Sequence, residues 1–134
     1  MVGGKGTTRN RSHNSKTASD LDVALPDGSG DEVYRQALAR SLQRVTKAGP
    51  FDLAIYLAGA DPFVDDRLGR LALTKNGLRD RDRLVIDWCR DLAIPLGIAM
   101  AGGYAREIKE IVDIHASTVH LASESCSAIG LRLE

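Results

Sequence analysis

The stretch FDLAIYLAGA, residues 51–60, decides the fold of this chain. Its apolar residues form a nearly continuous run, which is typical of a strand buried on both faces of a parallel sheet. An acidic residue, Asp61, follows directly. In parallel α/β sheets, ligands bind beyond the carboxyl ends of the strands. We therefore expect a buried strand near residues 52–58, with a candidate binding position where it ends.

Two further apolar runs predict strands. LDVAL, residues 21–25, is closed by a turn that contains Asp27 and Gly28, and PLGIAMA, residues 95–101, ends in Gly102, Gly103 and Tyr104. Each predicted strand is thus followed by polar or turn-forming residues. Because the carboxyl ends of parallel strands meet at one edge of a sheet, we expect residues 27, 61 and 104 to gather at one rim.

Between the predicted strands, apolar residues recur at helical spacing. This spacing predicts helices near residues 32–47, 75–91 and 106–122, with Thr74 as a cap and Gly49-Pro50 as a stop. The alternation of strand and helix predicts an α/β fold with a parallel sheet and helices on both of its faces. The apolar residues expected to be buried on these helices are Val33, Ala37, Leu38, Leu42, Val45, Leu78, Val85, Trp88, Leu92, Ile108, Ile111, Val112, Ile114, Val119 and Leu121.

Length and composition narrow the class of protein. The chain has 134 residues, enough for one domain, and 18 basic residues balance 18 acidic ones. Charge therefore gives no reason to expect a nucleic-acid or membrane partner. Two cysteines without metal-binding spacing favour reduced thiols and a cytoplasmic location. The first residues lack the apolar core of a secretory signal, and no apolar run approaches the roughly 20 residues of a membrane span.

Both ends of the chain differ from its middle. Residues 1–18 carry four basic residues, no acidic residue and almost no large apolar side chain. Such a segment buries too little surface to offset the entropy of ordering it, so we expect a disordered basic arm. Residues 19–122 carry the predicted strands and helices, and residues 123–134 read as a tail with no informative pattern.

From the residue types alone, alternatives to a binding site stay open. Asp61 precedes Pro62, and an aspartate in that position is commonly a turn or capping residue. Gly102 and Gly103 could form no more than a tight turn, and Tyr104 could be an amphipathic side chain at the rim.

Three blocks of sequence carry a resemblance to a known family. SDLDVALPDGSGDEVY (19–34), YLAGADPFVDDRLGRLALTKNGLRDRD (56–82) and AMAGGYAREIKEIVDIHASTV (99–119) resemble the C-terminal part of histone deacetylase-type amidohydrolases. The bacterial and class IV-like members are the most similar, and the blocks follow the family order and spacing. The resemblance implies part of the three-layer parallel sheet of the arginase–deacetylase fold, with about three strands and three helices.

The same resemblance implies roles for individual residues. Asp61 matches the second aspartate ligand of the family's catalytic zinc, and Tyr104 matches the tyrosine whose hydroxyl stabilises the developing oxyanion. Gly102 and Gly103 match glycines that line the channel for the acyl-lysine side chain. Asp27 and Gly28 match a loop at the rim of the site, to which no chemistry is assigned.

The chain also departs from the family pattern. No tandem His-His pair and no Asp-x-His motif precede the first block, and the residues before Ser19 include a single histidine, His13. We therefore expect a fragment of a zinc-dependent deacetylase, inactive and without retained zinc when alone. In the complete domain the substrate would be an acetylated lysine or a small acetylated amine. Two alternatives are half of a split deacetylase, completed by an upstream fragment, and a non-catalytic α/β binding module.

Overall fold

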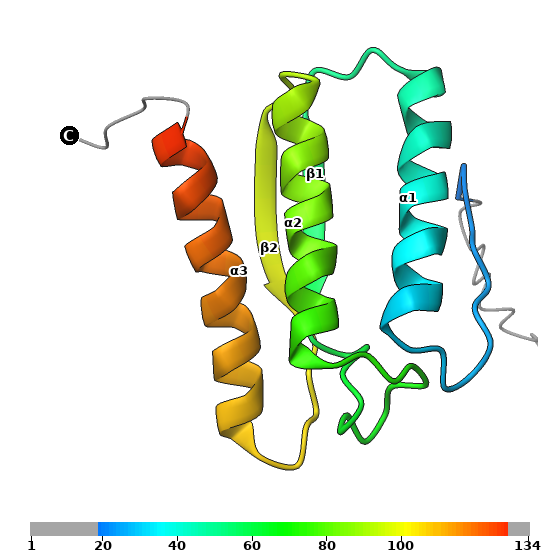
Figure 1. Cartoon of the computed structure of the whole chain (residues 1–134), viewed down its shortest axis with the longest axis vertical. Coiled ribbons are helices and arrows are strands. Elements are labelled where there is room, and N and C mark those ends of the chain that lie inside the picture. Colours follow the sequence, from blue (N-terminus) through cyan, green and yellow to red (C-terminus); the bar gives the residue numbers. More distant parts are fainter. Residues whose placement is uncertain (1–18, 129–134) are drawn as a thin grey trace, which may run out of the picture.

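The computed structural model describes residues 19–128, which form three helices and two strands (Figure 1). The predicted arm, residues 1–18, and residues 129–134 lie outside the described part. The elements are α1 (Asp31–Ala48), β1 (Ala54–Gly59), α2 (Lys75–Asp91), β2 (Leu96–Ala101) and α3 (Ile108–Ala128). All three predicted helices are present, but α3 continues to Ala128, six residues into the predicted tail.

β1 and β2 form a parallel pair joined by α2. Ala54 lies opposite Leu96 and Gly59 lies opposite Ala101, so both strands end at the same level. The α/β fold class predicted from the sequence is confirmed. This register determines which residues come together at the end of the sheet, because the segments that follow Gly59 and Ala101 leave the sheet side by side.

The predicted strand at residues 21–25 is not formed. The segment is extended but pairs with neither β1 nor β2. Val23 and Leu25 instead line a hollow against Tyr34 and Ala37 of α1. An apolar run becomes a strand only where a neighbouring strand accepts its hydrogen bonds, and the described residues provide none here.

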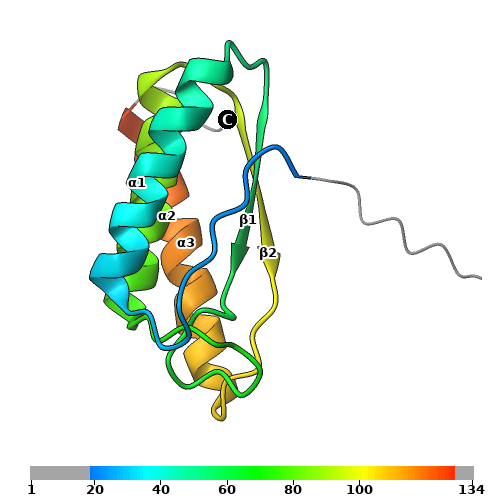
Figure 2. The same ribbon diagram turned by 90° about the vertical axis from the view of Figure 1, so that its right-hand side faces the viewer.

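The helices cover one face of the sheet, where two covered faces were expected. Figure 2 shows α1, α2 and α3 together on one side of β1 and β2, with no described segment layered on the other. Ile55 and Leu57 are consequently each 66% exposed. The prediction that this strand is buried on both faces is therefore wrong for the described residues. An apolar run indicates that both faces of a strand can be buried, but it does not identify the segments that bury them.

The core lies between the helices and the carboxyl ends of the strands. It is made by Ala60, Phe63, Leu73, Leu78, Ala105 and Ile114. Helix α3 contacts α2 through a narrow stripe that includes Ile114, Thr118 and Leu121. Among the apolar residues expected to be buried, Val33, Leu92, Ile108, Val112 and Val119 are exposed, because they lie off the faces that these helices pack.

The start of α2 is fixed to the start of α1. The hydroxyl of Thr74 accepts a hydrogen bond from Gly77 N–H at 3.0 Å, which confirms the predicted cap. The Thr74 hydroxyl and N–H both donate to the Asp31 carboxylate, at 2.7 and 2.8 Å. Asp31 thereby joins the first turn of α1 to the N-cap of α2. None of the helices in residues 19–128 is long and apolar enough to cross a membrane.

Candidate functional site

The carboxylate of Asp61 lies against the turn that follows β2. Gly103 N–H donates to Asp61 Oδ1 at 2.7 Å. Gly102 and Gly103 have φ angles of +63° and +113°, in the region that side chains disfavour. A Cβ on Gly102 would lie 2.0 Å from Asp61 Oδ2. The two glycines therefore let the backbone after β2 approach the Asp61 carboxylate, which follows β1.

Asp61 lies toward the open face of the sheet. Along β1, Ile55, Leu57 and Gly59 share the face that the helices leave uncovered, because side chains alternate along a strand. A Cβ on Gly59 would lie 3.4 Å from Asp61 Oδ2, so the carboxylate continues this row beyond the end of the strand. Within the described residues, Gly103 N–H is its hydrogen-bond partner and no ion pair involves it.

Tyr104 follows the same turn and its backbone is firmly held. Its N–H donates to Asp66 Oδ2 at 2.5 Å, and its carbonyl accepts from Arg67 N–H at 3.3 Å. The side chain is 55% exposed. Asp61 and Tyr104 thus follow the carboxyl ends of adjacent parallel strands, as expected. Their roles in metal binding and catalysis stay predictions.

Asp66 anchors the loop between β1 and α2 to the turn after β2. Its Oδ1 accepts from the N–H groups of Leu68 and Gly69, at 2.8 and 2.7 Å, and its Oδ2 accepts from Tyr104 N–H. Partial burial is the largest single effect and opposes ionisation, but the three backbone donors outweigh it and lower the pKa of Asp66. Asp66 therefore shapes the loop that surrounds Tyr104.

The predicted rim residues lie in a turn tied to the same loop. Gly28 N–H donates to the Arg70 carbonyl at 2.7 Å, and Gly28 has a φ angle of +78°. Asp27 is exposed. Since the strand at 21–25 is absent, Asp27 reaches this end of the molecule through a turn and not at the end of a strand. Figure 2 shows the turn beside the loop that follows β1.

A buried polar network beneath the site was missed by the sequence analysis. Asp82, 1% exposed, accepts from the hydroxyls of Tyr56 and Thr118, each at 2.5 Å. Arg81 Nε donates to Asp82 Oδ1 at 2.9 Å, and Arg81 Nη1 donates to the Gly59 carbonyl at 2.6 Å. The network therefore connects β1, α2 and α3, and it ends two residues before Asp61.

Tyr56 takes part in this network with its ring as well as its hydroxyl. The Arg81 guanidinium lies 5.8 Å from the ring centre. Burial raises the pKa of Tyr56 well above its ordinary range, and the adjacent Asp82 carboxylate acts in the same direction while Arg81 opposes it. The signal that could have revealed the network is a tyrosine inside an apolar strand, since a buried phenol needs a partner.

The described residues do not by themselves fit a catalytic zinc. Such a site needs about three protein ligands and an open position. Within residues 19–126, no group of three or more His, Cys, Asp or Glu side chains could hold a metal ion. Asp61 supplies a single carboxylate with one oxygen, Oδ1, already engaged by a backbone N–H.

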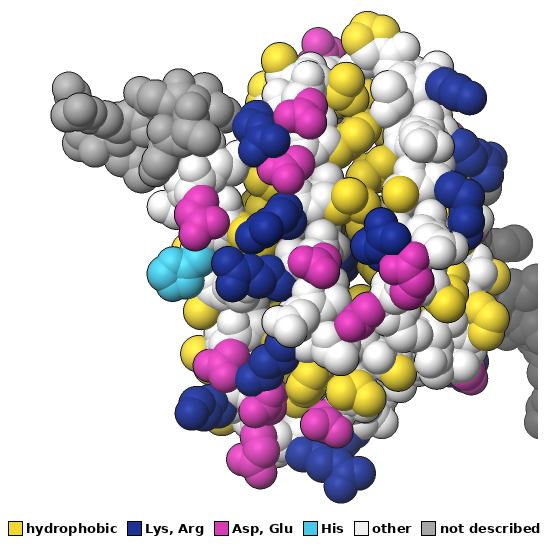
Figure 3. All heavy atoms as spheres, viewed as in Figure 1, with side chains coloured by type: hydrophobic (Ala, Val, Ile, Leu, Met, Phe, Trp, Pro, Cys, Tyr) yellow, Lys and Arg dark blue, Asp and Glu magenta, His cyan; other side chains and the backbone are white. Residues whose placement is uncertain are grey.

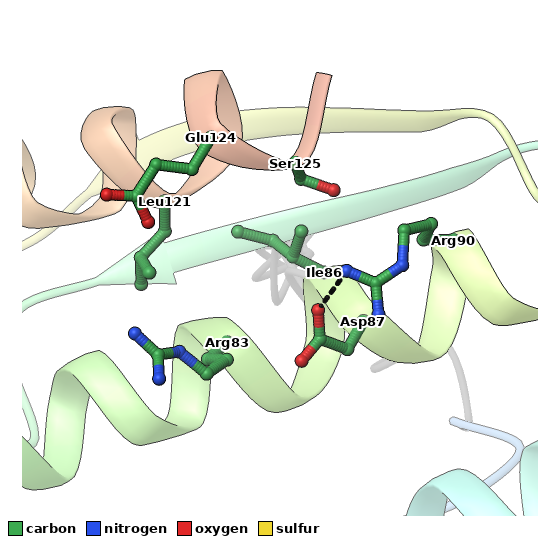
Figure 4. Close-up of a pocket in the computed structure, with 7 residues that line it drawn as sticks. All are labelled: Arg83, Ile86, Asp87, Arg90, Leu121, Glu124 and Ser125. Carbon is green, nitrogen blue, oxygen red and sulfur yellow. Dashed lines mark ion pairs between the residues drawn. The ribbon is translucent and has the colours of Figure 1, made fainter. Parts of the chain in front are cut away.

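One cavity between the helices lies away from Asp61. It measures about 150 Å³, lies between α2 and α3, and is lined by Arg90 and Asp87, which form an ion pair at 2.6 Å (Figure 4). Arg90 precedes the start of β2, whereas Asp61 follows the end of β1, so this cavity is at the opposite end of the sheet. Figure 3 shows that the helix face carries many charged side chains around an apolar groove between α1 and α2.

Comparisons with known proteins identify the family of this chain and two relatives. The family described as Histone deacetylase domain matches residues 4–119. An uncharacterized protein of Picosynechococcus sp. is 43% identical over 108 residues, which cover 81% of this chain and 36% of that protein. Histone deacetylase 2 of Arabidopsis thaliana is 29% identical over 93 residues, which cover 69% of this chain and 24% of the relative.

A solved structure shares the fold. The acetylpolyamine aminohydrolase of Burkholderia pseudomallei superposes with a TM-score of 0.65 at 21% identity, over 77% of this chain and 28% of its own. The chain therefore spans between about a quarter and about a third of the length of the relatives it matches.

Proposed function

Because this chain belongs to the histone deacetylase domain family, we propose that it contributes Asp61 and Tyr104 to a deacetylase active site. One observation carries the proposal: the Asp61 carboxylate lies on the glycine turn that leads to Tyr104, at the carboxyl ends of two adjacent parallel strands. In this proposal Asp61 is a metal ligand and Tyr104 is a hydroxyl donor, the roles that the resemblance of their sequence blocks implies.

The remaining ligands must come from outside residues 19–126, because these residues contain no metal-binding group of their own. A bound zinc would polarise the acyl carbonyl and acidify a water molecule. The chain's own contribution is orientation: Gly103 N–H fixes Asp61 Oδ1, which leaves Oδ2 for a metal. The substrate is an acetylated lysine or a small acetylated amine, whose acyl carbonyl accepts from the Tyr104 hydroxyl.

Activity assays of the purified chain test this proposal. We expect no hydrolysis of an acetyl-lysine peptide or an acetylated diamine by the chain alone, since one carboxylate does not hold a catalytic zinc. Co-expression with the part of the Picosynechococcus protein that the match leaves uncovered should give turnover, provided that this part supplies the other ligands. Absence of turnover from either protein in any combination would favour the non-catalytic binding module.

Matched variants separate the two roles in the reconstituted protein. Asp61→Asn should lower the zinc content, whereas Asp65→Asn, a change at an exposed neighbour, should not. Tyr104→Phe should keep zinc but slow turnover by about 10²–10³-fold, the loss expected for one oxyanion donor. Zinc-dependent turnover by the isolated chain that persists in Asp61→Asn would contradict both assignments.

A further inference from the structure

Two charged residues lie within the buried stripe of α2. Arg81 and Asp82 are 4% and 1% exposed, at positions where the helical spacing of the neighbouring buried residues calls for apolar side chains. A buried ion pair seldom stabilises a fold more than well-packed apolar residues of similar volume would. The pair is therefore better explained by something that apolar side chains cannot do, such as donating a hydrogen bond to the backbone.

Arg81 holds one side of the last peptide group of β1. Its Nη1 donates to the Gly59 carbonyl at 2.6 Å. The N–H of the same peptide group belongs to Ala60 and donates to the Ala101 carbonyl at 3.1 Å. Because a trans peptide group is planar and its C=O and N–H point in opposite directions, the two hydrogen bonds together fix its orientation. The segment after β1 is thus held by β2 on one side and by Arg81 on the side where the described residues provide no strand.

This peptide group leads directly to Asp61. The Asp61 Oδ1 accepts from Gly103 N–H at 2.7 Å, and Gly103 lies in the turn that follows Ala101. A rotation of the Gly59–Ala60 peptide group would therefore displace the Asp61 backbone and its carboxylate relative to that turn. The direction of the carboxylate thus depends on the hydrogen bond that Arg81 makes.

The guanidinium of Arg81 is itself held in place. Its Nε donates to Asp82 Oδ1 at 2.9 Å. Asp82 is fixed in turn by the hydroxyls of Tyr56 and Thr118. A planar guanidinium can bond the Asp82 carboxylate and the Gly59 carbonyl at the same time, whereas a lysine ammonium is a compact charge without this fixed geometry.

We propose that Arg81 is a positioning residue of the candidate site: it fixes the Gly59–Ala60 peptide group and, through it, the direction of the Asp61 carboxylate. The inference rests on the proposed function, in which Asp61 is a metal ligand, and deepens it. Arg81 approaches β1 from α2, on the helix side of the sheet, whereas Asp61 lies toward the open face (Figure 2). Arg81 therefore acts through the backbone and not by contact with metal or substrate.

Nuclear magnetic resonance of the full chain tests this role. The amide resonance of Gly103 reports its bond to Asp61. The amide resonance of Gly28, whose N–H donates to the Arg70 carbonyl at 2.7 Å, is the internal reference. Arg81→Met should shift the Gly103 resonance and leave the Gly28 resonance in place. Arg81→Lys should shift the Gly103 resonance less, because the ammonium can replace one of the two bonds of the guanidinium.

Two further variants separate positioning from stability, which urea denaturation measures. Asp82→Leu added to Arg81→Met should recover part of the lost stability but leave Gly103 shifted, because the Gly59 carbonyl still lacks its donor. Ile86→Ala, a change at a buried position beside the cavity in Figure 4, should lower stability without shifting Gly103.

The double variant decides the outcome even where Arg81→Met alone does not fold. The positioning role is overturned if the Gly103 resonance of the double variant matches that of the unmodified protein, or if Ile86→Ala shifts it equally. These measurements need neither zinc nor turnover, so a failure to hydrolyse acetylated substrates counts against the proposed function alone.

Discussion

At the residue scale, the contact between Asp61 and the glycine turn is the most demanding feature of the site. Gly102 and Gly28 both have positive φ angles, which a residue with a side chain disfavours. A Cβ at Gly102 would in addition overlap the Asp61 carboxylate, whereas a Cβ at Gly28 would meet nothing within 4 Å. Gly28→Ala should therefore cost only the conformational penalty, about 1–2 kcal/mol. Gly102→Ala should cost more and should displace Asp61.

Urea denaturation of the two glycine variants measures the difference in stability, and the amide resonance of Gly103 reports whether its bond to Asp61 survives. Equal losses of stability with an unchanged Gly103 resonance would contradict the close contact. This pair of variants isolates the steric effect, because the backbone penalty is common to both.

The lowered pKa of Asp66 predicts how the stability of the fold depends on pH. The folded state favours the ionised carboxylate, so Asp66 stabilises the fold above the pKa of the unfolded chain, about 4. This stabilisation is lost as the pH falls through the lower pKa of the folded state. Asp66→Asn should therefore destabilise the protein at neutral pH and flatten the acid side of its stability profile.

Denaturation followed from neutral to acidic pH checks the Asp66 prediction, with the exposed Asp65→Asn as the matched control. An acid-side profile of Asp66→Asn that parallels the unmodified protein would show that the three backbone bonds to Asp66 contribute no linkage.

At the scale of elements, a buried charge pair joins α2 to β1 and α3. Arg81 and Asp82 are 4% and 1% exposed, and Arg81 Nη2 lies 2.7 Å from Asp82 Oδ1. Arg81→Met should destabilise by about 3–5 kcal/mol, because Asp82 would be buried without its cation. The double variant Arg81→Met with Asp82→Leu should recover part of this loss. Arg83→Met, an exposed change on the same helix, is the control in chemical denaturation.

Sequence patterns predict the helices and strands better than they predict which segments pair with them or cover them. Helical spacing placed α2 at residues 75–91, its observed bounds, because Thr74 caps its start and apolar residues mark one face. The same reasoning gave residues 21–25 as a strand and Ile55 and Leu57 as buried. Those two errors share a cause: strand pairing and sheet coverage depend on segments distant in sequence, which local periodicity does not report. The Arg81–Asp82 network likewise joins segments that are distant in sequence, so local periodicity does not predict it.

The burial of individual leucines gives a direct check on this correction. Leu78 is 1% exposed and belongs to the core, so Leu78→Ala should cost about 2–5 kcal/mol. A buried strand at residues 52–58, as the sequence predicts, would give Leu57→Ala a similar cost. Leu57 is 66% exposed, so the structure predicts a change within about 0.5 kcal/mol. Urea denaturation measures the free energy of unfolding of both variants. A similarly large loss of stability in Leu57→Ala would mean that the sheet face on which Leu57 lies is covered in solution.

At the scale of the whole molecule, the three helices of residues 19–128 lie on one side of the two-stranded sheet that these residues form, and the other side is apolar (Figure 2). Unpaired strand edges and uncovered apolar faces promote association between chains. We expect the isolated chain to self-associate as its concentration rises, and the double variant Ile55→Ser with Leu57→Ser to do so less. Val112→Ser with Val119→Ser, two exposed positions on α3, should leave association unchanged.

Light scattering over a concentration series measures the self-association. The comparison of the two double variants matters more than the amount of association, because each removes two exposed apolar side chains and only one pair lies on the open sheet face. Equal effects of both pairs would mean that association follows total apolar exposure. A selective effect of the Ile55 and Leu57 changes would locate the adhesive surface on the sheet, beside the carboxylate of Asp61. A compact monomer at high concentration, unaffected by either pair, would instead show that two strands with one helix layer suffice as a finished fold.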